Sequence, residues 1–217
     1  MSNPKVRKMF LSIINHLQVM DNSNPPFTKW FPGGELSVCY NAVDRHVDEG
    51  HGEQLALVWD SPITGNKDTV TYAQLQDKVA RLAGVLAREG VGKGDRVLIY
   101  MPMVTEAVIA MLATVRLGAA HSVVFGGFAA KELAVRIRHA EPKVIISASC
   151  GIEPNRIVQY KPSVDEAIRL AGGNVKSLVL QRDQWKGEMN PGDLLWQEEV
   201  MMVMVMVMVM VMMEEVI

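Results

Sequence analysis

The sequence predicts an α/β fold in which a mainly parallel sheet carries helices on both faces. Apolar, β-prone runs alternate with helical patterns between residues 55 and 180, and several of the helical stripes stop at a glycine. Strands spaced in this way are joined by right-handed helical crossovers. The composition agrees with this class, because 49% of the 217 residues are apolar and the formal net charge is only -2. Such values are typical of a globular chain of about one domain.

The ordered pattern opens with a β-hairpin and a helix. The β-prone runs Leu55–Trp59 and Thr69–Tyr72 are separated by a turn-rich segment, which predicts the hairpin. Thr71 and Gln74 have the spacing of a capping box, and the apolar stripe that follows them stops at Gly90. A helix is therefore expected between the capping box and that glycine.

Strands and helices then alternate to residue 180. The last of the helices contains a second capping-box pair, Ser163 and Glu166. The expected strands are Arg96–Met101, His121–Phe125, Lys143–Ser147 and Ser177–Leu180, and the expected helices are Glu106–Leu117, Ala130–His139 and Ser163–Leu170.

The two ends of the chain differ from this pattern. Met1–Met20 carries basic residues and no acidic residue before Asp21, so it is either a weak transit peptide or an ordinary N-terminal leader. Met201–Met213 alternates Met and Val almost without exception and has no polar face. We interpret it as a low-complexity tail, with a strand buried on both sides as the alternative.

Several kinds of site are disfavoured. Gly90–Asp95 looks like a phosphate loop, but it precedes its strand and lacks the Walker A spacing, so a helix-to-strand turn is expected. No GxSxG, HExxH or GxGxxG motif occurs, and the basic residues are dispersed, which disfavours a nucleic-acid partner. No apolar stretch reaches the roughly 20 residues of a membrane span. The histidines His46, His51, His121 and His139 do not have the spacing of metal ligands. Cys39 and Cys150 lie far apart and form no CxxC pair, which disfavours a disulfide framework or a zinc site.

One short segment has the features of a ligand-binding loop. Phe125, Gly126, Gly127 and Phe128 directly follow an apolar strand. In an open parallel sheet, ligands bind beyond the carboxyl ends of the strands, and glycines allow close approach to the backbone. A tight turn with two core aromatic rings explains the same residues. From the pattern alone, both interpretations stay open.

A series of motifs in register resembles the family of AMP-forming acetyl-CoA and propionyl-CoA synthetases. The resemblance covers about Trp30 to Val200 and is closest to the mitochondrial, propionate-preferring branch in Gly151–Pro154 and Asp193–Trp196. The matching segments are Trp30–Gly34, Tyr40–His46, Asp60–Pro62, Thr69–Tyr72, Gly94–Val97, Tyr100–Met103 and Arg116–Phe128.

The resemblance refines the expected fold. It implies an incomplete parallel βαβ subdomain of the acyl-adenylate-forming enzymes, preceded by an N-terminal extension and a β-hairpin. The expected parts are a variable leader at 1–29, the synthetase N-terminal extension at 30–70, the first part of the AMP-binding domain at 71–200, and the Met/Val tail at 201–217.

Members of the family join a short carboxylic acid to coenzyme A through an acyl-adenylate, with cleavage of ATP to AMP and pyrophosphate. The resemblance implies that Phe125, Gly126, Gly127 and Phe128 lie against coenzyme A and that Arg156 contacts its 3′-phosphate.

The chain departs from the family pattern at two positions beside Arg156. Glu153 stands where acetate enzymes have a first arginine, and Asn155 stands where glycine is usual. These differences predict weaker or differently shaped recognition of the phosphate.

The 217 residues contain no Ser/Thr/Gly-rich ATP loop ending in Pro-Lys and no adenylation lysine. We therefore expect a truncated ligase with no catalytic or metal-binding residues of its own, a weak partial coenzyme A site, and ATP and Mg²⁺ used only by full-length members. The alternative is a non-catalytic coenzyme A-binding or regulatory fragment that self-associates through its incomplete sheet or its tail. The expected location is the mitochondrial matrix, or else the cytoplasm, with no nucleic-acid or membrane partner.

Overall fold

A computed structural model describes the backbone of residues 18–214 and the side chains of residues 18–206. The chain divides into Met1–Ser37 and Val38–Ile217. In the first unit, β1 (Met20–Asp21) pairs antiparallel with β2 (Lys29–Trp30). Most of the leader-like segment Met1–Met20 lies outside the described residues.

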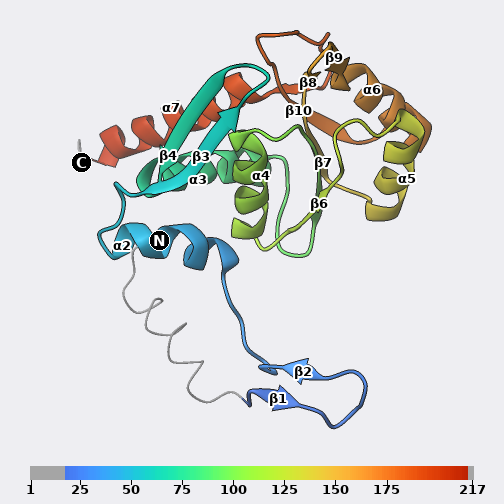
Figure 1. Ribbon diagram of the computed structural model, residues 1–217. Helices are drawn as coiled ribbons and strands as arrows, with labels where there is room; N and C mark the ends of the chain where they lie inside the picture. Colours follow the sequence, from blue (N-terminus) through green and yellow to red (C-terminus); the bar gives the residue numbers. More distant parts are fainter. Residues whose placement is uncertain (1–17, 215–217) are drawn as a thin grey trace. The chain divides into compact units, whose positions relative to one another are not determined.

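The second unit is built on a sheet of five parallel strands in the order β11-β10-β7-β5-β6. Its strands are β5 (Arg96–Tyr100), β6 (Ala120–Val123), β7 (Val144–Ala148), β10 (Lys176–Leu180) and β11 (Leu194–Leu195). Figure 1 labels β6, β7 and β10 of this sheet. The chain moves from β5 to β6 on one side and then returns to β7 on the other. The strand order therefore reverses between β5 and β7, which is the topological switch point of the sheet.

The central strands are mostly apolar because both faces of the sheet are covered, and the polar side chains of Ser147 and Ser177 are buried among them. Alternate side chains of β5 enter different cores: Val97 and Ile99 pack on one face, and Leu98 and Tyr100 on the other. Helices α3 (Tyr72–Arg88) and α4 (Thr105–Arg116) contribute to the first core. Helices α5 (Ala130–Ala140) and α6 (Tyr160–Ala171) contribute to the second. The expected α/β class with helices on both faces is confirmed.

The expected hairpin and the first capping box are also confirmed. Strand β3 (Leu55–Ser61) pairs antiparallel with β4 (Asn66–Thr71). The N–H of Gln74 donates to Thr71 Oγ1 over 3.3 Å, and the N–H of Thr71 donates to Gln74 Oε1 over 3.0 Å. Both ends of the hairpin and the start of α3 are therefore defined by local sequence signals. Before them lie the π-helix η2 (Tyr40–Asp44) and α2 (Arg45–Asp48), which were not expected from the sequence.

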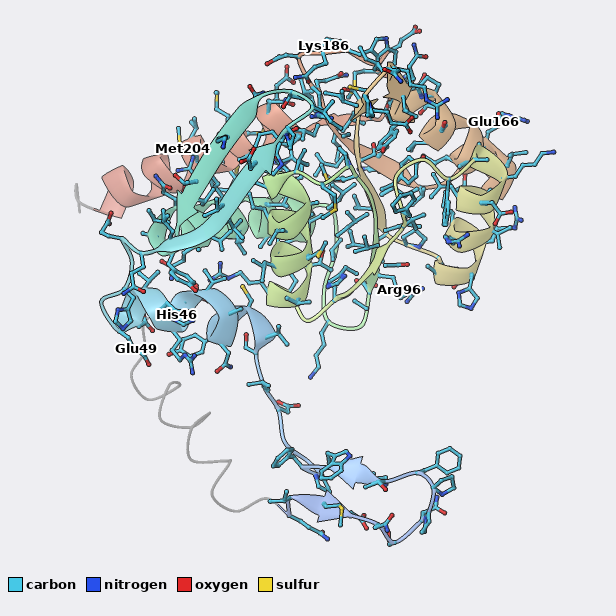
Figure 2. The ribbon with its side chains drawn as sticks, in the orientation of Figure 1. His46, Glu49, Arg96, Glu166, Lys186 and Met204 are labelled. Carbon is cyan, nitrogen blue, oxygen red and sulfur yellow. The ribbon has the colours of Figure 1, made fainter. Side chains whose placement is uncertain are left out.

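The second capping box is wrong. Helix α6 begins at Tyr160, so Ser163 is already inside its first turn, where its hydroxyl donates to the carbonyl of Gln159 over 3.4 Å. Glu166 pairs instead with Arg169 at 2.7 Å and points away from the sheet (Figure 2). The helix starts earlier because tertiary contacts, described below, satisfy its first amides.

The strand alternative for the Met/Val segment is also wrong. Residues 201–213 are the continuation of α7 (Trp196–Glu214), a helix that packs on α3. Val203 lies against Gly84, where an added Cβ would come 3.0 Å from Val203 Cγ1. Met favours helices, and the segment offers no polar face that would favour a half-buried strand. In the part of the chain that the structure describes, no helix is long and apolar enough to cross a membrane.

Candidate functional site

The carboxyl ends of β5, β6 and β7 lead into the segments that form the candidate site. Open parallel sheets bind ligands at this edge, in the crevice beside the switch point. Three segments lie there: the end of β5 at Tyr100, the glycine loop Phe125–Phe128 after β6, and the hairpin that follows β7. The loop and Arg156, which the resemblance selected separately, thus follow the two strands that flank β5 in the sheet.

The glycine loop presents one aromatic ring to solvent and folds the other back. Phe125 is 74% exposed, whereas Phe128 is half-buried and packs on the second core. The two ring centroids are 6.0 Å apart, and the Arg136 guanidinium lies 4.6 Å from the Phe128 ring centroid. Gly127 has a φ of 111°, which side chains rarely allow. The loop is therefore a tight turn with an exposed apolar surface. The interpretation with two core aromatic rings is wrong for Phe125, because only Phe128 packs on a core.

The Tyr100 side chain is hydrogen-bonded to the backbone of this loop. Its hydroxyl donates to the carbonyl of Phe128 over 2.9 Å and accepts from the N–H of Gly127 over 3.1 Å. The side chain is only 1% exposed. Burial raises the pKa of Tyr100, although the Gly127 N–H acts in the opposite direction. A neutral hydroxyl thus joins the end of β5 to the backbone of the loop.

Arg156 lies on a short hairpin that was not expected from the sequence. Strand β8 (Cys150–Glu153) pairs antiparallel with β9 (Arg156–Gln159), and Glu153 stands directly opposite Arg156. The Arg156 Nε donates to Glu153 Oε2 over 2.7 Å. This hydrogen bond is the main reason that the pKa of Glu153 is lowered and that of Arg156 raised. The guanidinium is exposed but occupied by an intramolecular carboxylate.

The ring of Tyr160 lies between the glycine loop and the hairpin. An added Cβ would come 2.9 Å from Tyr160 Cζ at Gly126 and 2.6 Å at Gly151. Both glycines are thus needed for close packing on one ring. Tyr160 also packs on Tyr100, with ring centroids 4.9 Å apart. Among the described interactions, Arg156 makes no hydrogen bond or ion pair with the glycine loop, so the two tyrosines connect the segments.

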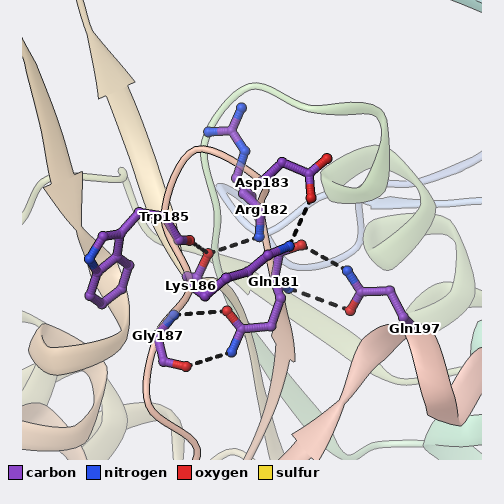
Figure 3. A network of polar contacts seen from close by, with 8 residues as sticks. Gln181, Arg182, Asp183, Trp185, Lys186, Gly187 and Gln197 are labelled. Carbon is purple, nitrogen blue, oxygen red and sulfur yellow. Dashed lines mark hydrogen bonds and ion pairs between the residues drawn. The ribbon is translucent and has the colours of Figure 1, made fainter.

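Ser149 fixes the base of the hairpin. Its carbonyl accepts the N–H groups of Tyr160 and Lys161 over 2.9 and 3.0 Å, which explains the early start of α6. Its hydroxyl donates to the carbonyl of Trp185 over 2.7 Å and accepts from the N–H of Arg182 over 2.9 Å. Figure 3 shows this network continuing through Gln181, whose side-chain amide bonds both backbone groups of Gly187. The loop after β10 therefore supports the start of α6.

The buried ammonium group of Lys161 also stabilises the start of α6. Lys161, next to Tyr160, is 1% exposed, and its Nζ lies 2.5 Å from an Asp165 oxygen and 2.8 Å from an Asp193 oxygen. A buried ammonium needs such partners, because desolvation without them is costly. The first turn of α6, and with it the Tyr160 ring, is anchored by both backbone and side chain.

The candidate surface is open. Two hollows, with volumes of about 290 and 460 Å³, are lined by other residues, such as Arg182 in the first and Arg169 in the second. Neither includes the glycine loop or Arg156. In the described residues no group of three or more His, Cys, Asp or Glu side chains could hold a metal ion.

The expected helix-to-strand turn at Gly90–Asp95 is confirmed and lies at the other end of β5. The N–H of Gly92 donates to Asp95 Oδ2 over 2.9 Å, so the turn bonds to itself. Neither Tyr100 nor Tyr160 was expected from the sequence to have a role in the site. Tyr100 had one usable signal, its place at the end of a buried strand, but nothing local distinguishes Tyr160.

Comparison with known proteins places the chain in a family. The family model described as AMP-binding enzyme matches residues 43–204, and the model of the acetyl-coenzyme A synthetase N-terminus matches residues 15–42. The mitochondrial acyl-CoA synthetase short-chain family member 3 of Rattus norvegicus is 47% identical over 186 residues, covering 84% of this chain and 27% of that protein. The acetyl-coenzyme A synthetase of Streptomyces avermitilis is 45% identical over 183 residues, covering 84% and 28%.

A solved structure gives the same fold. The acetoacetyl-CoA synthetase from Streptomyces lividans superposes with a TM-score of 0.75 at 24% identity, over 92% of this chain and 31% of that chain. The chain thus spans a little over a quarter of the length of these curated relatives. Since one family model covers most of its residues, the chain belongs to the AMP-binding enzyme family, among the short-chain acyl-CoA synthetases.

Proposed function

We propose that residues 18–206 hold part of the coenzyme A site of a short-chain acyl-CoA synthetase, at the glycine loop and the β8–β9 hairpin. The observation that supports this most is that both segments pack on the one ring of Tyr160 beside the switch point of the sheet. Segments that act on one ligand need to be held at a fixed spacing. In the full-length enzyme this site would serve the step in which the thiol of coenzyme A takes the acyl group from the acyl-adenylate.

The glycine loop suits the apolar and planar parts of coenzyme A. The exposed Phe125 ring offers a surface for stacking. No atom lies within 4 Å of an added Cβ at Gly127, so a ligand chain has room beside its backbone. We assign Phe125, Gly126, Gly127 and Phe128 to this contact, with Gly126 acting through its packing on Tyr160.

Arg156 suits the 3′-phosphate. A guanidinium pairs with phosphate oxygens through several N–H donors in a fixed plane. In the ligand-free chain the Glu153 carboxylate pairs with the Arg156 guanidinium, and a bound phosphate would have to displace this carboxylate. Side-chain exposures of 70% for Arg156 and 49% for Glu153 leave room for the exchange. Binding is expected to be weak, because the surface is open and part of the gain is offset by the lost ion pair.

The acid-activating half of the reaction lies outside these residues. The sequence contains no ATP loop and no adenylation lysine, so the 217-residue chain has no groups to stabilise the charge that develops on the α-phosphate. Propionate or acetate with ATP and Mg²⁺ would be used by a full-length protein. We favour propionate because of the local resemblance at Gly151–Pro154; the identities to the rat and Streptomyces relatives, 47% and 45%, do not discriminate.

The mitochondrial matrix is the proposed location. The rat, bovine and human relatives carry the word mitochondrial in their names. A fluorescent protein fused to residues 1–20 should enter mitochondria. Cytoplasmic fluorescence of that fusion, with a known transit peptide imported in parallel, would contradict the assignment.

The site is tested by calorimetry with coenzyme A and 3′-dephospho-coenzyme A. The wild type should prefer coenzyme A, with a dissociation constant in the high micromolar to millimolar range, and Arg156→Ala should remove most of that preference. The matched control is Arg169→Ala, because Arg169 also pairs with a glutamate three residues away at 2.7 Å, with exposures of 70% and 45%. If the wild type ignores the 3′-phosphate, or Arg156→Ala keeps the preference, the assignment is wrong.

A further inference from the structure

The hydroxyl group of Tyr160 is placed at the centre of the candidate site without a protein partner. The structure gives it no hydrogen bond to any described residue, in contrast to Tyr100, whose hydroxyl makes two. The hydroxyl oxygen lies where an added Cβ of Gly126 or of Gly151 would clash with it. It therefore lies between the glycine loop on one side and the hairpin that carries Arg156 on the other.

This hydroxyl is not sealed inside the protein. Tyr160 as a whole is 6% exposed. Within the described residues, the fully buried side-chain N and O atoms without a partner are the hydroxyl oxygens of Ser147 and Ser177. Since the Tyr160 hydroxyl also lacks a protein partner and is not one of these, it retains contact with solvent. A polar group in this position is available to a ligand.

Its protonation state makes it a donor. Burial raises the pKa of Tyr160 to about 12, and the neighbouring Tyr100 adds to the rise. The phenol is thus neutral at physiological pH. The backbone of α6 does not offer the same donor, because its first two N–H groups already bond to the carbonyl of Ser149.

We propose that Tyr160 is a ligand-binding residue whose hydroxyl donates a hydrogen bond to a phosphate oxygen of coenzyme A bound across the glycine loop and the hairpin. The proposal rests on the proposed function of this surface. Phosphate is the chemistry that fits, because two guanidinium groups supply positive charge: Arg156 on the hairpin, paired with Glu153 without ligand, and Arg182, whose charge acts on Tyr160. A hydrogen bond to an ionised acceptor is also stronger than one between neutral groups. The two packing glycines leave the oxygen of Tyr160, rather than a side chain of their own, at the junction of the segments.

The test is Tyr160→Phe, which keeps the ring between Gly126 and Gly151 and removes only the hydroxyl. Loss of one such hydrogen bond, to a charged acceptor, should weaken coenzyme A binding by about 10- to 100-fold. Because no protein hydrogen bond is lost, the free energy of unfolding and the amide chemical shifts of Gly126 and Gly151 without ligand should stay near those of the wild type. Tyr72→Phe is the matched control: the Tyr72 hydroxyl also has no partner among the described residues, and its ring stacks on His46.

The ligand pair separates the two possible acceptors. A loss seen with coenzyme A but not with 3′-dephospho-coenzyme A supports a contact to the 3′-phosphate, and an equal loss with both supports a contact to the diphosphate. If Tyr160→Phe binds both ligands as tightly as the wild type does, the inference is wrong. The proposed function would still stand if Arg156→Ala removes the preference for coenzyme A over 3′-dephospho-coenzyme A. If the wild type does not bind coenzyme A, both the inference and the proposed site are wrong.

Discussion

Replacing Tyr100 with Phe should destabilise the protein and loosen the glycine loop. The change removes one buried hydroxyl group and leaves the ring, so the packing of the second core is preserved. Two hydrogen bonds are lost, of 2.9 Å to Phe128 and 3.1 Å from Gly127. Each contributes about 0.5 to 1.5 kcal/mol in a typical protein, so the free energy of unfolding should fall by about 1 to 3 kcal/mol.

Urea unfolding of wild type, Tyr100→Phe and Tyr160→Phe measures this loss. The denaturant midpoint should fall for Tyr100→Phe with little change in slope. Tyr160→Phe is the internal control, because it removes a hydroxyl without a protein hydrogen bond from the neighbouring ring. Its unfolding free energy should differ from the wild type by less than about 0.5 kcal/mol.

The same variants separate positioning from binding. Tyr100→Phe should broaden the amide resonances of the glycine loop before any ligand is added, whereas Tyr160→Phe should affect only the complex. Equal stability of Tyr100→Phe and the wild type, with unchanged loop resonances, would refute the role of the Tyr100 hydroxyl in holding the loop.

Four further outcomes are expected. The purified chain should release no pyrophosphate with propionate or acetate, since the ATP loop is absent; acid-dependent release above blank, in protein free of host synthetase, contradicts this. Glu153→Gln should improve binding of coenzyme A but not of its 3′-dephospho form, by calorimetry, because the carboxylate no longer competes for Arg156; Glu166→Gln is the control, and equal gains with both ligands would argue against competition. Deleting residues 201–217 should raise solubility, since α7 has an exposed apolar face formed by Met201, Met202, Val205 and Met206. Equal solubility of the full chain and the shortened chain in a sedimentation assay would contradict this expectation. Stability should also fall in alkali: a folded pKa of about 12 for Tyr160 against 10.0 in the unfolded chain favours the neutral form, so this contribution is complete below pH 10 and lost towards pH 12. Tyr160→Phe should flatten this part of the stability profile, and an unchanged profile would exclude Tyr160 as its source.

The strands and helices of the sheet were predictable because burial leaves a mark on the sequence. Strands β5, β7 and β10 are covered on both faces and therefore read as apolar runs, and α3 shows its buried stripe and its capping box. The capping pair at Ser163 failed for a tertiary reason. The carbonyl of Ser149, which precedes the hairpin, satisfies the first amides of α6, and a local signature contains no information about that contact.

The Met/Val segment shows the limit of periodicity itself. Its alternation has the period of a strand, but periodicity selects a strand only when apolar and polar residues alternate. With apolar residues at every position, helix propensity and the preceding turn decide. Glu198 and Glu199 lie in the first turn of α7, where acidic side chains favour the helix, and Val203 fits against Gly84.

The glycine loop and Arg156 of the candidate site were predictable from the sequence, but the packing that connects them was not. The glycine loop and Arg156 were selected by resemblance, but the spacing between them depends on a residue with no local signal. Tyr160 can fill the gap only because Gly126 and Gly151, which are distant in sequence, both lack a Cβ. An alanine at either position would force the ring aside and change the distance between the loop and the hairpin. The two glycines and the tyrosine therefore act as one unit, and a substitution at any of them should alter coenzyme A binding even when its own side chain never touches the ligand.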